Sequence, residues 1–109
     1  MPIFNLFSLL PEKTADEEFR ELLIRHNIRV ERIVSPPHTA TETMNQEQDE
    51  WVALLQGWAD LEMEDRRWRL HAGDSLLIPA RTLHRVLDTS DEPRCIWLTV
   101  HIHAEPAGN

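Results

Sequence analysis

From residue 28 onward, apolar and polar positions alternate with the two-residue period of half-buried β-strands. The run 59–63 shows this most clearly, because Ala, Leu and Met alternate there with Asp and Glu. Proline, glycine and acidic turn residues separate the runs. Strands are expected at 28–34, 51–56, 59–63, 67–70, 75–78, 83–88 and 94–103. Many short strands with turn signals between them predict a sandwich or a closed barrel.

The chain before residue 28 has a different pattern. Thr14 stands three residues before Glu17, as in a helix capping box. Phe19, Leu22 and Leu23 then recur at helical spacing, and Asn27 suits a helix end. We therefore expect a short amphipathic helix packed on the barrel. Residues 1–27 form this N-terminal unit, 28–104 the barrel and 105–109 a tail.

The segment 38–49 is polar and is expected to be a long loop or an irregular strand. Loops of this length in a compact domain are often functional.

Length and charge limit the number of domains and the classes of partner that the chain can have. The chain has 109 residues, which suits one domain, and a formal net charge of −8. This charge argues against partners rich in phosphate, both nucleic acids and anionic membrane surfaces.

The single cysteine indicates the compartment. Cys95 cannot form an internal disulfide and lies in an apolar strand pattern, so it is expected to be buried and inert. Residues 1–13 lack the basic region and the cleavage site of a signal peptide. A cytoplasmic location is expected.

Two polar side chains stand where predicted strands begin. Glu50 precedes the strand 51–56, and His84 lies at the start of the strand 83–88. If both face inward, they meet in one hollow inside the barrel, where a buried carboxylate needs a metal, a proton or a donor. The alternatives are a rim carboxylate paired with Arg81 or Arg85, and a structural histidine bonded to a backbone carbonyl.

His101 and His103 share one face of the last strand, a pattern that could chelate a metal. Because they lie at a strand end, we expect a surface pair.

Four tryptophans are many for this length: Trp51, Trp58, Trp68 and Trp97. They could line a pocket, fill a core or form a dimer interface. Trp51 and Trp97 are expected to face away from the cavity and to serve sheet or subunit packing.

These residues together resemble the cupin family. The positions that match its two motifs are Glu50 and Gly57 in the first, and Gly73, Pro79 and His84 in the second. Arg81 and Asp88 replace a glycine and an asparagine of the second motif. The paired histidines of the first motif are absent from residues 43–46. The resemblance implies an all-β fold, a single-domain jelly-roll β-barrel, with the short N-terminal helix added.

The resemblance also implies a site. Cupins that bind a metal use histidines and a glutamate of these motifs, which here leaves Glu50 and His84. Gln46 lies near a missing histidine, and its amide oxygen could ligate a hard divalent ion. The implied function is binding of a small molecule, with or without a divalent metal, in the barrel of a homodimer. The alternatives are a metal-dependent dioxygenase, isomerase or decarboxylase, and a non-catalytic structural or regulatory module.

Overall fold

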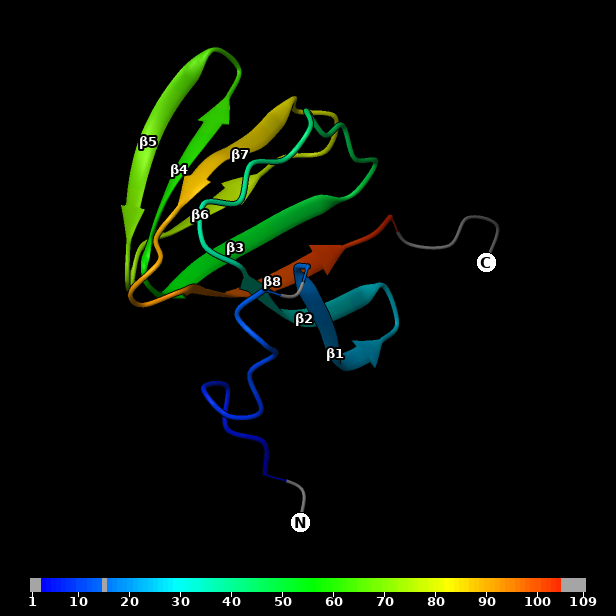
Figure 1. Cartoon of the computed structure of the whole chain (residues 1–109). Coiled ribbons are helices and arrows are strands. Elements are labelled where there is room, and N and C mark those ends of the chain that lie inside the picture. Colours follow the sequence, from blue (N-terminus) through cyan, green and yellow to red (C-terminus); the bar gives the residue numbers. More distant parts are fainter. Residues whose placement is uncertain (1–2, 15, 105–109) are drawn as a thin grey trace.

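The computed structural model describes residues 3–14 and 16–104 of the chain. Eight strands form two antiparallel sheets that face each other as a jelly-roll barrel (Figure 1). The strands are β1 (Glu18–Arg25), β2 (Ile28–Ser35), β3 (Asp49–Gln56), β4 (Trp58–Met63), β5 (Arg66–His71), β6 (Ser75–Ile78), β7 (His84–Thr89) and β8 (Cys95–Ile102). The larger sheet has the order β1-β2-β8-β3-β6, and the smaller has the order β5-β4-β7. The all-β barrel expected from the sequence is therefore correct.

The expected N-terminal helix is wrong. Its residues form β1, which pairs antiparallel with β2 through a two-residue turn at His26 and Asn27. A β-bulge between Glu21 and Leu23 breaks the two-residue period, which is why the apolar positions of β1 imitate helical spacing. Pairing with β2 has overridden a weak local preference for helix. No helix occurs in the part of the chain that the structure describes.

The register of the larger sheet decides which side chains face the inside. β8 lies between β2 and β3, with His101 opposite both Arg29 and Glu50. Thr99 and Trp97 follow on the same face of β8, because side chains two residues apart share a face. The buried apolar core lies deeper between the sheets and includes Val52, Leu54, Ala59, Leu61, Leu70, Ile78, Cys95 and Trp97.

The polar segment between β2 and β3 runs along β7. Thr41 donates its backbone N–H to the Val86 carbonyl, and Met44 and His84 exchange two backbone hydrogen bonds of 2.7 and 3.1 Å. Residues 38–46 thus act as an irregular strand on the free side of β7. They form part of the cavity wall, since Thr41 and Met44 both line the cavity described below.

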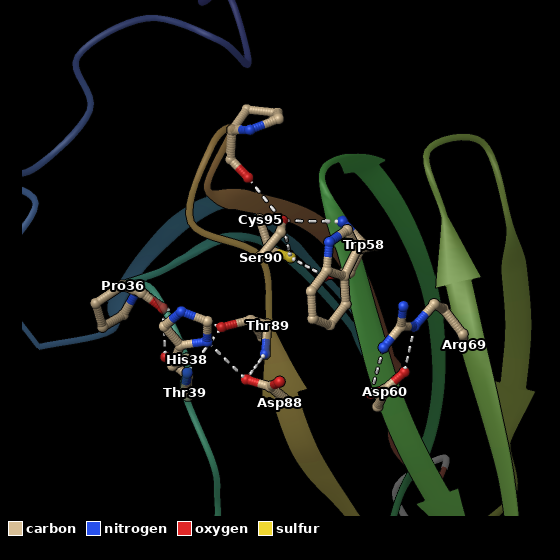
Figure 2. A network of polar contacts seen from close by, with 11 residues as sticks. Pro36, His38, Thr39, Trp58, Asp60, Arg69, Asp88, Thr89, Ser90 and Cys95 are labelled. Carbon is tan, nitrogen blue, oxygen red and sulfur yellow. Dashed lines mark hydrogen bonds and ion pairs between the residues drawn. The ribbon is translucent and has the colours of Figure 1, made fainter.

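A polar network joins the start of β4 to the segment between β7 and β8 (Figure 2). Ser90 Oγ accepts the backbone N–H of Trp58, and the buried Cys95 thiol donates to the Trp58 carbonyl at 2.9 Å. Burial raises the pKa of this thiol, in agreement with the expectation that Cys95 is a buried structural residue. Gly57 is required beside it, because its φ is +86° and a Cβ there would lie 2.5 Å from Ser90 Oγ. The same region contains a contact of 3.1 Å between His38 Nδ1 and the Asp88 carboxylate, and the ion pair of Arg69 with Asp60.

Arg32 fixes the N-terminal segment to the outer face of the larger sheet. Its guanidinium is fully buried and donates to the backbone carbonyls of Leu6, Ser8 and Leu9. It also forms an ion pair with Glu18 at 2.9 Å. These contacts satisfy both terminal nitrogens of the guanidinium, whereas its Nε has no partner among the described residues. Hydrogen bonds and an opposite charge offset the cost of burying the guanidinium.

We predict that Arg32→Met releases the N-terminal segment. Three carbonyls and the Glu18 carboxylate lose their donor, so the free energy of unfolding should fall by about 3–5 kcal/mol. Amide hydrogen exchange of residues 5–10 should also accelerate. Chemical denaturation checks the first result, with Arg66→Met, at an exposed position of β5, as the control. Equal stability of the two variants would contradict the prediction.

Candidate functional site

A cavity of about 250 Å³ lies between the two sheets. Glu50 enters it from β3, His84 from β7 and Gln46 from the segment beside β7. The structure therefore brings together the three residues that the sequence proposed as a site. Apolar side chains, among them Val52 and Leu61, form much of the remaining wall. Such a wall with a few convergent polar groups is typical of a small-molecule site.

The protonation of His84 follows from its contacts. The ring is almost completely buried, and Nδ1 lies 2.8 Å from the Thr82 carbonyl oxygen. Because a carbonyl can only accept, Nδ1 carries the proton in this contact. In the neutral ring, Nε2 is then an unprotonated acceptor. Within residues 3–14 and 16–104, this buried atom has no hydrogen-bond partner.

Gln46 presents a second unsatisfied atom. Its backbone carbonyl accepts the N–H of Arg81 at 2.6 Å, which anchors the residue at the cavity. Its buried side-chain oxygen Oε1 has no partner in the part of the chain that the structure describes. Buried acceptors in folded proteins are usually paired, so two unpaired ones lining the same cavity indicate room for a ligand.

Glu50 is buried beside these acceptors, with 8% of its surface exposed. Burial raises the pKa of its carboxyl group, and the nearby Glu31 raises it further. His101, the Gln46 side chain and Arg29 oppose this shift. No ion pair joins Glu50 to Arg81 or Arg85 among the described residues, and Arg85 instead donates to Glu62 at 2.8 Å. The arginine-paired rim carboxylate is therefore not what the structure contains.

The expected surface pair of histidines is wrong for His101. This side chain is buried in the cavity wall, where Nε2 lies 3.3 Å from Glu31 and Nδ1 lies 3.1 Å from Gln48. His103 lies beyond the end of β8 and is exposed. The sequence could have indicated His101 only if the pairing of β8 with β3 had been known, since that register places it beside Glu50.

Trp97 was expected to face away from the cavity, and this is also wrong. It is buried, lines the cavity and belongs to the core. Its indole N–H donates to Ser35 Oγ at 3.0 Å, and Ser35 donates in turn to the Glu17 carboxylate. Burial raises the pKa of Glu17, while the Ser35 hydrogen bond lowers it. Trp51 does lie on the outer face of β3, where it is partly exposed.

The residues present fit a transition metal poorly. Among residues 3–14 and 16–104, no group of three or more His, Cys, Asp or Glu side chains is placed to hold a metal ion. Met44 and Gln46 stand in the segment where histidines would be needed. The donors at the positions that the sequence proposed are one imidazole, one carboxylate and one amide oxygen, a set that suits a hard divalent cation better than zinc.

Comparison with known proteins agrees with this geometry. The Cupin domain family matches residues 31–101. A crystal structure of a candidate mannose-6-phosphate isomerase from Ralstonia eutropha is 36% identical, has a TM-score of 0.84, and the alignment covers 94% of this chain and 98% of that one.

More distant structures share the fold. A cupin superfamily protein from Desulfitobacterium hafniense is 15% identical, with a TM-score of 0.80 and coverage of 95% and 90%. KdgF from Halomonas is 15% identical, with a TM-score of 0.71 and coverage of 81% and 80%.

No curated protein matches the sequence. The described residues contain no helix of the length and apolarity needed to cross a membrane. The barrel, the two motif remnants and the family match together show that the chain belongs to the cupin family.

Proposed function

We propose that this cupin binds a small molecule in the cavity between its sheets. One observation carries the proposal: His84 Nε2 and Gln46 Oε1 are buried and have no partner among the described residues, and both residues line the same cavity as Glu50. Leaving a buried acceptor unpaired costs about 1–3 kcal/mol, and a ligand that donates hydrogen bonds removes this cost. The volume of about 250 Å³ equals that of roughly eight water molecules, at ~30 Å³ each, which suits a ligand of about that many non-hydrogen atoms.

A divalent cation is the second candidate occupant of the same site. The same two unpaired atoms, together with the Glu50 carboxylate, would supply three ligands. A bound cation would supply Lewis acidity, and His84 would keep its orientation through Thr82 in either case.

The lone buried cysteine suits a reducing compartment, so we propose a cytoplasmic location for this binding activity.

We predict that filling the cavity abolishes binding. Val86→Phe adds volume inside the cavity, whereas Leu83→Phe adds it at an exposed position next to β7. Fragments of up to about eight non-hydrogen atoms, spanning alcohols, amines, carboxylates and small polyols, should shift amide resonances of β3, β7 and β8 in the unaltered protein. The same shifts should persist in Leu83→Phe and disappear in Val86→Phe. The proposal fails if no fragment shifts these resonances, or if both variants respond equally.

We predict that any bound metal depends on Glu50 and His84. Elemental analysis of protein purified without a histidine tag should find about one divalent ion per chain if the second candidate is correct. The ion should be lost in the double variant Glu50→Gln/His84→Gln and retained in His103→Gln, which alters an exposed histidine. Metal-free protein that still binds fragments would exclude the cation and leave the first candidate standing.

A further inference from the structure

The unpaired atoms of the cavity wall are of two kinds, and this inference, which names a ligand class, rests on the proposed function. Gln46 Oε1 and, in the neutral ring, His84 Nε2 can only accept hydrogen bonds. Arg29 Nε can only donate one, and the Thr99 hydroxyl can do either. All four atoms are buried without a partner among the described residues, and all four residues line the cavity. A ligand that pairs them must therefore both donate and accept.

These residues come from both sides of the barrel. Arg29 on β2 lies directly opposite His101 of β8, and Thr99, two residues earlier on β8, shares the inner face of that strand. His84 enters from β7 of the smaller sheet, and Gln46 from the segment beside β7. A small ligand between the sheets can therefore contact donors and acceptors at the same time.

The neighbouring carboxylate does not satisfy Arg29 Nε. The Glu31 oxygen nearest in direction lies 3.9 Å from this nitrogen, which is too far for a hydrogen bond. The other Glu31 oxygen lies 3.3 Å from His101 Nε2. Hydrogen bonds from a charged donor are stronger than those between neutral groups, so an oxygen atom of a bound ligand is a favourable partner for Arg29 Nε.

A formal charge of either sign on the ligand is unfavourable in this wall. The carboxylates of Glu17, Glu31 and Glu50 line the cavity together with a single guanidinium among the described residues, so an anion would be repelled. A cation would be repelled by Arg29 and would leave its Nε without an acceptor. Hydroxyl groups donate and accept hydrogen bonds without a net charge. They are the groups that suit all of these atoms.

We propose that the ligand is a small neutral diol or polyol. Two hydroxyl groups supply two donors, one for His84 Nε2 and one for Gln46 Oε1. Their oxygens accept from Arg29 Nε and from the Thr99 hydroxyl. The hydrocarbon part of the ligand contacts the apolar residues of the wall, among them Leu61. The cavity of about 250 Å³ sets the size of this ligand at roughly eight non-hydrogen atoms.

Four probes built on one ring test the ligand class. The cis-cyclopentanediol with hydroxyls on adjacent carbons is compared with cyclopentanol, and with the corresponding protonated amino alcohol and ionised hydroxy acid. Their dissociation constants are measured by NMR titration of protein treated with a chelator. The diol should bind about tenfold more tightly than cyclopentanol, because its second hydroxyl pairs further buried atoms. Both charged analogues should bind about tenfold more weakly than the diol.

Arg29→Met tests the role of the charged donor. The substitution removes the guanidinium, so the diol loses one hydrogen bond and the amino alcohol loses a like charge beside it. The diol should bind about fivefold more weakly and the amino alcohol about fivefold more tightly, which reverses their order. Arg66→Met, at an exposed position of β5, should change neither constant. An unchanged order in Arg29→Met would contradict the proposal.

Thr99→Val distinguishes a ligand contact from a structural role. The substitution removes the unpaired hydroxyl and keeps nearly the same shape. The ligand-free protein should become more stable, with a higher midpoint of chemical denaturation, because a buried polar group without a partner is costly. The diol should at the same time bind about threefold more weakly. A lower midpoint would mean that the hydroxyl serves the folded chain itself, and it would count against the proposal.

The outcomes separate this inference from the proposed function. If cyclopentanol or a charged analogue binds as tightly as the diol, the ligand class is wrong and the small-molecule site stands. If none of the four probes binds, the diol proposal fails, and the fragment screen with Val86→Phe decides whether the site itself fails.

Discussion

The register of β8 between β2 and β3 is the constraint on which the site depends. Once Ile102 pairs with Asp49 and with Ile28, every second residue of β8 faces inward. The same register that buries Trp97 over the apolar core therefore also buries His101 and Thr99 near the cavity. A slip of one residue would expose all three. The polar site and the hydrophobic core are two stretches of one face.

Burying the polar groups of this face costs desolvation free energy, and hydrogen bonds and ion pairs offset only part of that cost. His101 and Arg29 contact the Glu31 carboxylate, and the Trp97 indole N–H donates to Ser35 Oγ. Six buried side-chain atoms of the described residues have no hydrogen-bond partner, and four of them belong to residues of the cavity wall: Arg29, Gln46, His84 and Thr99. Native proteins leave few such atoms unpaired. The other two, Arg20 Nε and Arg32 Nε, lie outside this wall, so most of the unpaired atoms surround one hollow, as in a binding site.

The fold was predictable because it depends on patterns of short range. Alternation from residue 28 onward, the turn residues between runs and the positions of Gly57, Gly73, Pro79 and His84 each indicate strands or their ends. β1 was misread because its bulge shifts the apolar period, and only its pairing with β2 decides its conformation. His101 and Trp97 were misplaced for a related reason. The sequence shows which residues share a face of a strand, but only the neighbouring strands decide which face is inside.

The attachment of Met44 to β7 has a consequence for how such a barrel can diversify. Met44 and His84 are joined through backbone atoms alone, and Gln46 is anchored through its own carbonyl. The side chains at 44 and 46 are thus not needed to hold this segment in place. Substitutions there can exchange sulfur, amide or imidazole donors while the scaffold keeps its shape. Point mutations at these two positions can therefore add or remove ligand-binding groups during evolution while the fold stays the same.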